Sequence, residues 1–356
     1  MNSVAVFQTA FLGDLLLCIP LLKNIRSCYP NSKIYLVCRK PYGKFFLDLE
    51  LVDEVLEVDK KNKASIVELK TKLERLEVDL LLCPHESFRS AILCKKIKSK
   101  KSIGAKRWFS DLFFSSTVLK PHDLPDALRQ SSLLVPVHPK FGVAWLAYVS
   151  EYRAQKDHLL ASLDLNISIP EPFSMTTPSS LNLSDTLSEK LSSEEKWIGL
   201  APGSVWNTKK WRSDHFVELG NKFRSDGYQV VLLGAPNEFE LCSEVGKQIP
   251  ESINLAGETD LTQLYLVLKR LSLLVSNDSG TMHMAAVAGT KTLSVFGPTT
   301  LDLGYRPWQK QALVAQTDLS CRPCGKHGHD KCPIGTHQCM KDIKPSFVKE
   351  LSKQLL

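Results

Sequence analysis

One carboxylate stands in a short loop near the start of the chain, where a general base could act. The loop is QTAFLGD, residues 8–14, and Asp14 is its only charged residue. A partly desolvated Asp can accept a proton from a hydroxyl group. The alternative is that Asp14 only caps the helix that follows. Both interpretations stay open at this point.

A second loop, APGSVWNTKKW at residues 201–211, has the composition of an anion site. Gly203 and Ser204 can bring backbone amides close to an anion, and Lys209 offers an ammonium group that suits a phosphate. A lysine in a loop is otherwise a solvated surface charge. Because this loop follows an apolar strand and precedes a helix, we favour diphosphate binding.

A third segment, NDSGTMH at residues 277–283, follows another apolar strand. Ser279 and Gly280 open a helix, so their amides could hold phosphate oxygens at its positive end. His283 would face the same ligand, unless it is a buried structural histidine. Asp278 is unfavourable beside a phosphate unless it caps the helix or accepts a hydrogen bond from a sugar hydroxyl. This favours a nucleotide sugar over a bare nucleotide.

Strands and helices that alternate along the chain position these loops. Strands are expected at residues 3–7, 34–38, 55–58 and 78–83, with a helix from Asp14 and another at 66–76. A second series has strands at 198–200, 229–234, 253–255, 273–276 and 292–296, separated by helices at 213–226, 237–247, 261–271 and 281–288. Continuous apolar runs indicate parallel strands that are covered on both faces.

Between the two series, residues 168–193 differ in composition. Fourteen of these twenty-six residues are Ser, Thr or Pro, which predicts an interdomain linker with room for a short helix. The fold class is therefore α/β, with two doubly wound units. In such sheets ligands bind beyond the carboxyl ends of the strands.

Composition excludes several other classes of protein. The 356 residues include 45 basic and 38 acidic side chains, a net charge of +7, and 43% of the residues are hydrophobic, which is typical of a globular protein. No apolar run is long enough to span a membrane and no secretory signal is present, so we expect a cytoplasmic protein. The sequence also lacks the P-loop of ATPases, a GxGxxG after the first strand as in dinucleotide-binding folds, the HExxH of zinc proteases and the GxSxG of hydrolases.

Six segments together resemble glycosyltransferase family 9, the heptosyltransferases, and most of all the heptosyltransferase II branch. In family order they are QTAFLGDLLLCIPLL, SFRSA, APGSVWNTKKW, VVLLGAPNE, SNDSGTMHMAAVAGTKTLSVFGPT and CRPCGKHGHDKCPIGTHQCMKDI, and they span residues 8–343. Agreement of several motifs over nearly the whole chain is far more specific than any single loop.

This resemblance implies a GT-B fold, in which two Rossmann-like domains face each other across a cleft. Residues 1–167 would bind the acceptor, 168–193 form the linker, 194–343 bind the nucleotide sugar, and 344–356 form a C-terminal helix. The implied reaction moves heptose from ADP-L-glycero-D-manno-heptose to the lipid A-linked inner core of lipopolysaccharide, at the cytoplasmic face of the inner membrane. It would invert the anomeric centre without a metal.

The resemblance also implies roles for individual residues. Asp14 matches the catalytic base, and Lys209 matches the contact to the diphosphate. Glu238 falls near the expected contact to ribose or adenosine. The remaining donor-binding positions are Ser204, Val205, Asp278, Ser279, Gly280, Thr281 and His283. Two alternatives stay open: a family 9 transferase with another nucleotide sugar and another surface glycan, and a nucleotide-sugar-binding protein without turnover.

Four of the ten cysteines, Cys321, Cys324, Cys332 and Cys339, lie within nineteen residues. The CxxC pair is typical of zinc sites, and His327, His329 and His337 offer further ligands. Structural zinc, two disulfides and reduced packing thiols are the alternatives. The mechanism is expected to require no metal or other cofactor.

A basic stretch at residues 95–107 has seven basic and no acidic side chains. We expect a solvated surface loop; the alternative is a contact with anionic phospholipid or with the phosphates of a core acceptor. The acceptor or anion contacts that we expect in this half of the chain are Ser87, Arg89, Lys100, Lys101 and Arg107. No aromatic interleaving or recognition module supports nucleic-acid binding.

Overall fold

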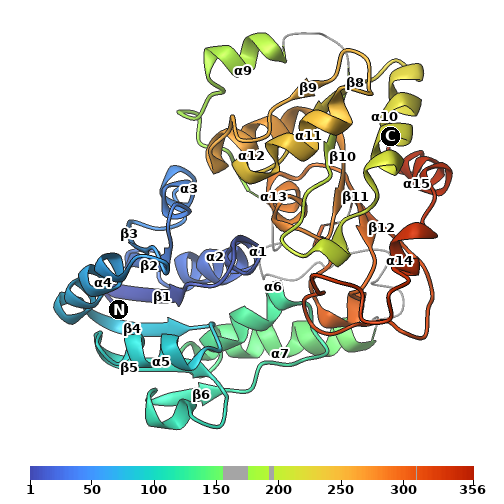
Figure 1. Ribbon diagram of the computed structural model, residues 1–356. Helices are drawn as coiled ribbons and strands as arrows, with labels where there is room; N and C mark the ends of the chain where they lie inside the picture. Colours follow the sequence, from blue (N-terminus) through green and yellow to red (C-terminus); the bar gives the residue numbers. More distant parts are fainter. Residues whose placement is uncertain (155–174, 192–195, 310) are drawn as a thin grey trace. The chain divides into compact units, whose positions relative to one another are not determined.

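The computed structural model describes residues 1–154, 175–191, 196–309 and 311–356. The chain divides into two compact units, of which the first ends near Pro178 and the second begins near Ser179. Within the described ranges, each unit contains one parallel sheet of six strands with helices on both faces (Figure 1). The predicted α/β class with two doubly wound units is therefore confirmed.

The sheet of the first unit has the strand order β3-β2-β1-β4-β5-β6. Because the chain adds strands first on one side of β1 and then on the other, the direction of winding switches between β1 and β4. Loops that follow these two strands flank the point where doubly wound sheets bind ligands. The strands are β1 (Ser3–Gln8), β2 (Lys33–Arg39), β3 (Glu54–Val58), β4 (Glu77–Cys83), β5 (Lys98–Ala105) and β6 (Ser116–Val118).

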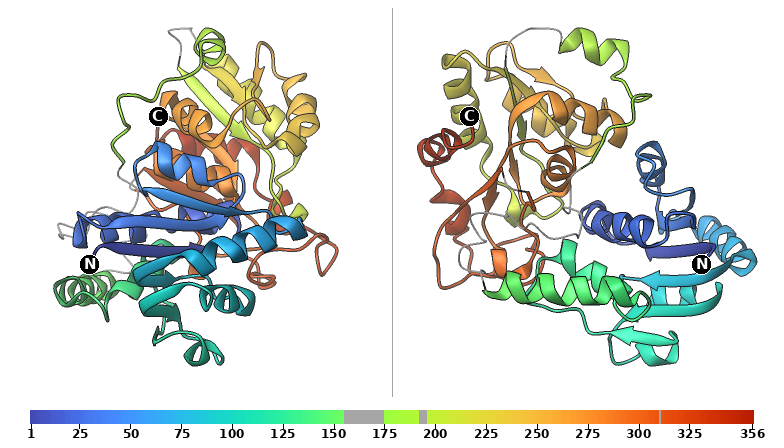
Figure 2. Two further views of the ribbon diagram at one scale, coloured as in Figure 1. Left: turned by 90° about the vertical axis from the view of Figure 1, so that its left-hand side faces the viewer. Right: turned by 180° about the vertical axis from the view of Figure 1, so that it is seen from behind.

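Helices cover both faces of this first sheet. Leu69 and Leu73 of α4 pack with Ala91 of α5 against Ala5 and Phe7 of β1. Helices α2 and α6 pack together with the short turn η2 (Gln130–Leu134) on the other face, and α7 is the long green helix of Figure 2. The helices are α1 (Leu12–Leu16), α2 (Ile19–Cys28), α3 (Gly43–Asp48), α4 (Lys63–Arg75), α5 (Phe88–Cys94), α6 (Asp126–Arg129) and α7 (Pro139–Ala154).

The sheet of the second unit repeats the topology of the first, with the order β12-β11-β10-β7-β8-β9. Its winding switches between β7 and β10, so the loops after these two strands flank the corresponding ligand position. The strands are β7 (Trp197–Ala201), β8 (Gln229–Leu232), β9 (Ile253–Asn254), β10 (Leu271–Asn277), β11 (Thr292–Phe296) and β12 (Ala312–Gln316).

Helices α10, α11 and α15 share one core with this sheet, through buried residues such as Phe216, Val245 and Val348. Helices α12 and α13 pack on each other and on β10. The helices of the unit are α9 (Asp185–Lys190), α10 (Ser213–Ser225), α11 (Phe239–Gly246), α12 (Leu261–Arg270), α13 (Gly280–Ala288), α14 (Gln338–Lys341) and α15 (Pro345–Ser352). The C-terminal helix thus belongs to the core of the second unit.

The predicted linker lies partly outside the described residues. Its described part contains the short helix α9, whose first turn is capped by Ser184. The Ser184 amide also donates a hydrogen bond of 2.9 Å to the Gln263 side chain of α12.

The basic stretch differs from the prediction of a surface loop, because residues 98–105 form strand β5. Lys98 and Lys100 pair with Glu77 and Asp79 of the adjacent strand β4, at 2.7 Å in both cases. These cross-strand pairs offset the low strand propensity of lysine. The local excess of positive charge is therefore smaller than the sequence implies.

None of the described helices has the length and apolar composition that crossing a bilayer would require.

Candidate functional site

Two polar loops meet the switch point of the first sheet. Strand β1 ends at Gln8, and Asp14 lies in the single turn of α1 that follows. Strand β4 ends at Cys83, and His85 follows it before α5 begins. The parallel pairing of β1 with β4 brings both strand ends to the same edge of the sheet.

Asp14 contacts the start of its own helix, although Phe11 is the N-cap residue. The backbone N–H groups of Phe11 and of Asp14 itself favour the ionised carboxylate. The capping interpretation therefore describes part of its environment. It does not determine the acidity of the group, because other influences are larger.

Burial is the main reason why the pKa of Asp14 is raised from 3.8 to about 6. The negative charge of Asp126 raises the pKa further, and the ammonium group of Lys120 opposes both effects. At pH 7 Asp14 is thus largely ionised and yet more basic than an ordinary Asp. That combination suits a general base that takes a proton from a hydroxyl group.

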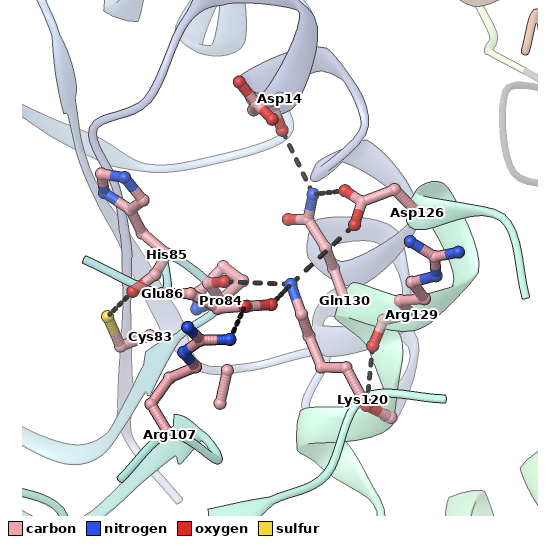
Figure 3. A network of polar contacts seen from close by, with 12 residues as sticks. Asp14, Cys83, Pro84, His85, Glu86, Arg107, Lys120, Asp126, Arg129 and Gln130 are labelled. Carbon is pink, nitrogen blue, oxygen red and sulfur yellow. Dashed lines mark hydrogen bonds and ion pairs between the residues drawn. The ribbon is translucent and has the colours of Figure 1, made fainter. Parts of the chain in front are cut away.

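A hydrogen-bond network built around Gln130 connects Asp14 to Asp126 (Figure 3). Nε2 of Gln130 donates to the Asp14 backbone oxygen at 3.2 Å and to Oδ2 of Asp126 at 2.7 Å. Oε1 of Gln130 lies 3.4 Å from Nε2 of Gln8. This network fixes the end of β1, the first turn of α1 and helix α6 relative to one another.

Lys120 lies beneath this network as a buried cation. Its Nζ lies 2.8 Å from Oε1 of Glu86 and 3.9 Å from Oδ1 of Asp126, and it donates to the Pro84 backbone oxygen at 3.2 Å. Arg107 reaches the other oxygen of Glu86 at 3.7 Å (Figure 3). Two cations and two carboxylates thus compensate one another close to Asp14.

His85 is a site residue that the sequence motifs did not single out. Its Nδ1 lies 3.2 Å from Oγ1 of Thr9 and 2.8 Å from Oγ of Ser90. Burial, together with the charges of Lys60 and Lys120, lowers the pKa of His85 to about 4. His85 is therefore neutral at pH 7. The signal that could have identified it is its position directly after the apolar strand 78–83.

A group of cations also acts on Lys60, which interacts electrostatically with Asp14. The pKa of Lys60 is lowered by burial and by the nearby charges of Arg39 and Arg89, while the Asp14 carboxylate opposes this shift. Lys60 and Arg39 were not predicted as site residues. Together with Arg89 they form a group of positive charges around Lys60 that suits an anionic ligand.

The structure separates the acceptor contacts expected from the sequence into two groups. Ser87 is the N-cap residue of α5, and Arg89 lies in the first turn of this helix. Arg107 follows β5 and pairs with Glu86. These three residues lie at the carboxyl edge of the sheet, as Asp14 does. Lys101 is in register with Leu80, the middle residue of β4, and Lys100 precedes it. Those two lysines are not brought together with Asp14.

In the second unit, a buried ion pair joins the loops after β7 and β10. Nζ of Lys209 lies 2.6 Å from Oδ2 of Asp278, and Oγ1 of Thr299 donates to the same oxygen at 2.7 Å. All three residues are buried. Asp278 therefore orients Lys209, which explains why a carboxylate stands in a loop that was expected to bind phosphate.

Asn277 fixes both ends of the 201–211 loop. Its Nδ2 donates to the Pro202 backbone oxygen at 2.8 Å, and its Oδ1 accepts from the Trp211 amide at 2.9 Å. The same loop also contacts Asp278, the first residue after β10. Oγ of Ser204 donates to the Asp278 backbone oxygen at 3.4 Å. Val205, by contrast, has an exposed side chain.

The carboxylate of Glu238 lies directly over Gly203. A Cβ atom at position 203 would fall 2.1 Å from Cδ of Glu238, so a larger residue there would require the Glu238 side chain to move. Oε2 of Glu238 accepts a hydrogen bond from the Ala235 amide at 2.8 Å. The structure thus places Glu238 beside the 201–211 loop.

The N-terminus of α13 follows Asp278 directly. Ser279 is the N-cap residue, and its buried Oγ forms no hydrogen bond within the described part of the chain. Gly280 and Thr281 begin the helix, and His283 is buried in its first turn. Free amides, a free hydroxyl and the helix dipole make this position suitable for an anionic group.

The cysteine-rich loop at residues 321–337 packs on the turn η3 (Asn207–Lys209). Backbone N and Oγ1 of Thr208 both donate to the His329 oxygen, at 3.0 and 2.8 Å. Nε2 of His337 lies 2.7 Å from the Thr208 oxygen. Gly328 approaches so closely that a Cβ there would lie 3.2 Å from Cγ of Lys209. The loop therefore packs against Thr208 and Lys209 and restricts the position of the Lys209 side chain.

The four cysteines of this loop region are free thiols in the structure, not disulfides. Burial raises the pKa of Cys339 to about 11 and also raises the pKa of Cys324. Among the described residues, no group of three or more His, Cys, Asp and Glu side chains has an arrangement that could hold a metal ion. Structural zinc therefore stays a prediction from the sequence.

Comparison with known protein families shows which family the chain belongs to. The sequence profile of glycosyltransferase family 9 (heptosyltransferase) matches residues 66–333, which is well over half of the chain. The chain belongs to glycosyltransferase family 9. It is thus a glycosyltransferase, and the family resemblance of the sequence motifs is confirmed.

Individual members of the family resemble the chain over its whole length. Lipooligosaccharide heptosyltransferase 2 of Campylobacter jejuni subsp. jejuni serotype O:2 is 27% identical, and the alignment covers 99% of this chain and 98% of the relative. The solved ADP-heptose LPS heptosyltransferase II of E. coli is 21% identical, with a TM-score of 0.71 and coverage of 100% and 98%. The E. coli heptosyltransferase WaaC with ADP has a TM-score of 0.70 at 16% identity, with coverage of 99% and 100%. The GT-B fold expected from the sequence is confirmed by these neighbours.

Proposed function

We propose that the protein transfers heptose from ADP-L-glycero-D-manno-heptose to the inner core of lipopolysaccharide, as a heptosyltransferase II. The full-length similarity to lipooligosaccharide heptosyltransferase 2 supports this acceptor class. A relative of the same fold is known with ADP, which supports an ADP-sugar donor. The observation that carries the proposal is that the first unit holds a basic carboxylate, Asp14, and the second unit holds a buried, oriented cation, Lys209, that suits a diphosphate.

In the proposed mechanism Asp14 acts as the general base. Its carboxylate takes the proton from an acceptor hydroxyl while the hydroxyl oxygen forms a bond to the anomeric carbon of the donor. The bond from that carbon to the diphosphate breaks in the same step, and ADP leaves with the electron pair. A single displacement of this kind inverts the anomeric centre. The raised pKa of Asp14 strengthens it as a base while leaving it ionised at neutral pH.

The leaving diphosphate needs positive charge, and residues of the second unit can supply it. Lys209 is already oriented by Asp278 and Thr299, so it loses little freedom when it meets a phosphate. The amides at the N-terminus of α13 and the free Oγ of Ser279 offer further hydrogen-bond donors. We therefore propose that transfer needs no metal ion. Glu238, beside Gly203, is proposed to accept hydrogen bonds from the ribose.

Cations near Asp14 fit an acceptor that carries phosphate or carboxylate groups. The Asp14 carboxylate acts electrostatically on Lys60, as do the charges of Arg39 and Arg89. We propose that Arg39 and Lys60 receive the charged inner core, and that the protein works at the cytoplasmic face of the inner membrane. A family 9 transferase with another nucleotide sugar and another surface glycan is the second candidate.

The deciding experiment is incubation with a panel of nucleotide sugars and truncated core acceptors, read by mass spectrometry. A mass increase of one heptose that requires ADP-heptose supports the proposal, and transfer of another sugar supports the second candidate. Donor binding without transfer to any acceptor would indicate a binding protein. The anomeric configuration of the product, determined by NMR, tests inversion. Activity after extensive chelation, together with elemental analysis, tests metal independence and the zinc alternative.

A further inference from the structure

Four large apolar side chains are exposed on two neighbouring segments of the first unit. Trp108 is 86% exposed and Leu112 is 74% exposed, both in the turn that follows β5. Phe88 and Ile92, on adjacent turns of α5, are 46% and 41% exposed. We call these four residues the aromatic patch. They lie by α5 and before β6, both labelled in Figure 1.

The aromatic patch is held in place by the residues beneath it. The Trp108 indole stacks on the Phe88 ring at 6.4 Å with an interplanar angle of 9°. Phe109 makes edge contacts with both rings, at 5.4 and 5.2 Å, and is itself buried in the core. Trp108 is therefore supported on a rigid base while most of its surface faces solvent. A supported and exposed cluster of this kind is typical of an interaction surface.

Basic residues are frequent in the segment that carries the aromatic patch. Residues 87–120 include nine basic side chains and one acidic side chain. Lys98 and Lys100 of β5 are paired with carboxylates of β4. Arg89 of α5 and Lys95, the C-cap residue of this helix, are exposed and form no ion pair with the other described residues. Lys106 and Arg107 directly precede Trp108 but pair with Asp111 and Glu86, so the unpaired charges nearest the patch residues in the sequence are Arg89 and Lys95. An exposed indole beside unpaired cations matches the chemistry of an anionic bilayer surface.

We propose that the aromatic patch inserts into the headgroup region of an anionic phospholipid bilayer, with Arg89 and Lys95 on the lipid phosphates. The proposal rests on the proposed function, in which the acceptor is lipid-linked. Beyond that function, the proposal specifies which surface of the protein contacts the membrane. Because Phe88 and Arg89 follow β4 and Trp108 follows β5, the patch lies at the edge of the sheet where Asp14 lies. A second copy of the chain is a poorer occupant, since a symmetric contact would bring the same cations together.

Vesicle sedimentation with the full-length protein tests the proposal. The probes are vesicles of phosphatidylethanolamine with phosphatidylglycerol, and neutral vesicles of phosphatidylcholine. Trp108→Ser combined with Leu112→Ser is expected to lower the partition coefficient on the anionic vesicles about tenfold. Arg89→Gln combined with Lys95→Gln is expected to lower it by a similar factor and to weaken its dependence on salt. Val67→Ser, on α4, is the matched control because Val67 is 61% exposed outside the patch.

Each outcome bears on the proposal. Equal partition of the Trp108/Leu112 variant and the wild type, or no preference for anionic vesicles, would overturn it. A dimer in the wild type that dissociates in this variant would assign the patch to a second copy instead. Circular dichroism and thermal melting show whether the variants are folded.

Transfer to a water-soluble acceptor fragment separates this proposal from the proposed function. The Trp108/Leu112 variant should transfer at the wild-type rate to this fragment and several-fold more slowly to a vesicle-embedded acceptor. Equal losses with both acceptors would also contradict membrane docking. Absence of transfer by the wild type would count against the proposed function, while the partition result would still decide the role of the patch.

Discussion

Lys209 and Asp278 form a buried ion pair, with 2.6 Å between Nζ and Oδ2, and Thr299 donates to the same carboxylate oxygen. The two residues come from loops that are 69 positions apart in the chain and follow the strands on either side of the switch point. The pair therefore ties together the two loops that we propose to bind the donor. It also leaves the ammonium group in a defined position before any phosphate arrives.

Asp278→Asn should destabilise the second unit and weaken ADP binding. Removing one partner leaves the Lys209 charge buried without compensation, at a cost of about 3 kcal/mol. Lys209→Met combined with Asp278→Asn should recover most of that stability but none of the ADP affinity. Chemical denaturation and calorimetric titration with ADP measure the two effects. If the double variant bound ADP as the wild type does, Lys209 would not contact the diphosphate.

Asp14→Asn should reduce turnover by about 10²- to 10⁴-fold, the range for loss of a general base, and leave ADP affinity unchanged. In the wild type, kcat/KM should rise with pH through about 6, since only ionised Asp14 accepts the proton. Asp126→Asn removes a negative charge that raises the pKa of Asp14, so this rising limb should move to lower pH. A rising limb that stays in place in Asp126→Asn would exclude Asp14 as its origin.

The same pKa shift predicts how stability depends on pH. Because the folded state binds the Asp14 proton more tightly than the unfolded state does, the wild type should lose stability as pH rises from about 4 to about 6. Asp14→Asn lacks this loss, so it should be more stable above pH 6 by about 1 to 3 kcal/mol. The advantage should disappear below about pH 4. Denaturant unfolding of both proteins at pH 4 and pH 7 measures it.

Strand ends explain which site residues could be found from the sequence. Asp14 follows an apolar strand within a short loop, and the topology then brings it to the active edge. His85 follows β4 by the same rule, so its position in the sequence carries the same signal. Lys120, Asp126 and Gln130 come from a region without alternating strands and helices, and their proximity to Asp14 depends on tertiary packing alone.

The basic stretch shows why local composition misled the prediction of an element. Lys98 and Lys100 have low strand propensity, so the pattern favours a loop. Their partners, Glu77 and Asp79, lie 21 residues earlier in each case, and only the parallel register of β4 and β5 places them opposite. A pairing of this kind cannot be read from the stretch itself.

Gly328→Ala should raise the KM for the donor while leaving the fold intact. Gly328 has φ +80°, and an added Cβ would lie 3.1 Å from Oγ1 of Thr208 and 3.2 Å from Cγ of Lys209. Gly335→Ala is a matched control, because Gly335 has φ +75° in the same loop and an added Cβ would meet nothing within 4 Å. Both variants should lose about 1 kcal/mol of stability from backbone strain.

Only Gly328→Ala should displace Lys209, so it alone should weaken ADP binding, by several-fold, with a smaller change in kcat. Steady-state kinetics with varied donor and titration with ADP measure this difference. Equal effects of the two substitutions on donor KM would show that the loop acts through stability alone. A selective effect of Gly328→Ala would establish that the cysteine-rich loop positions the lysine that meets the diphosphate.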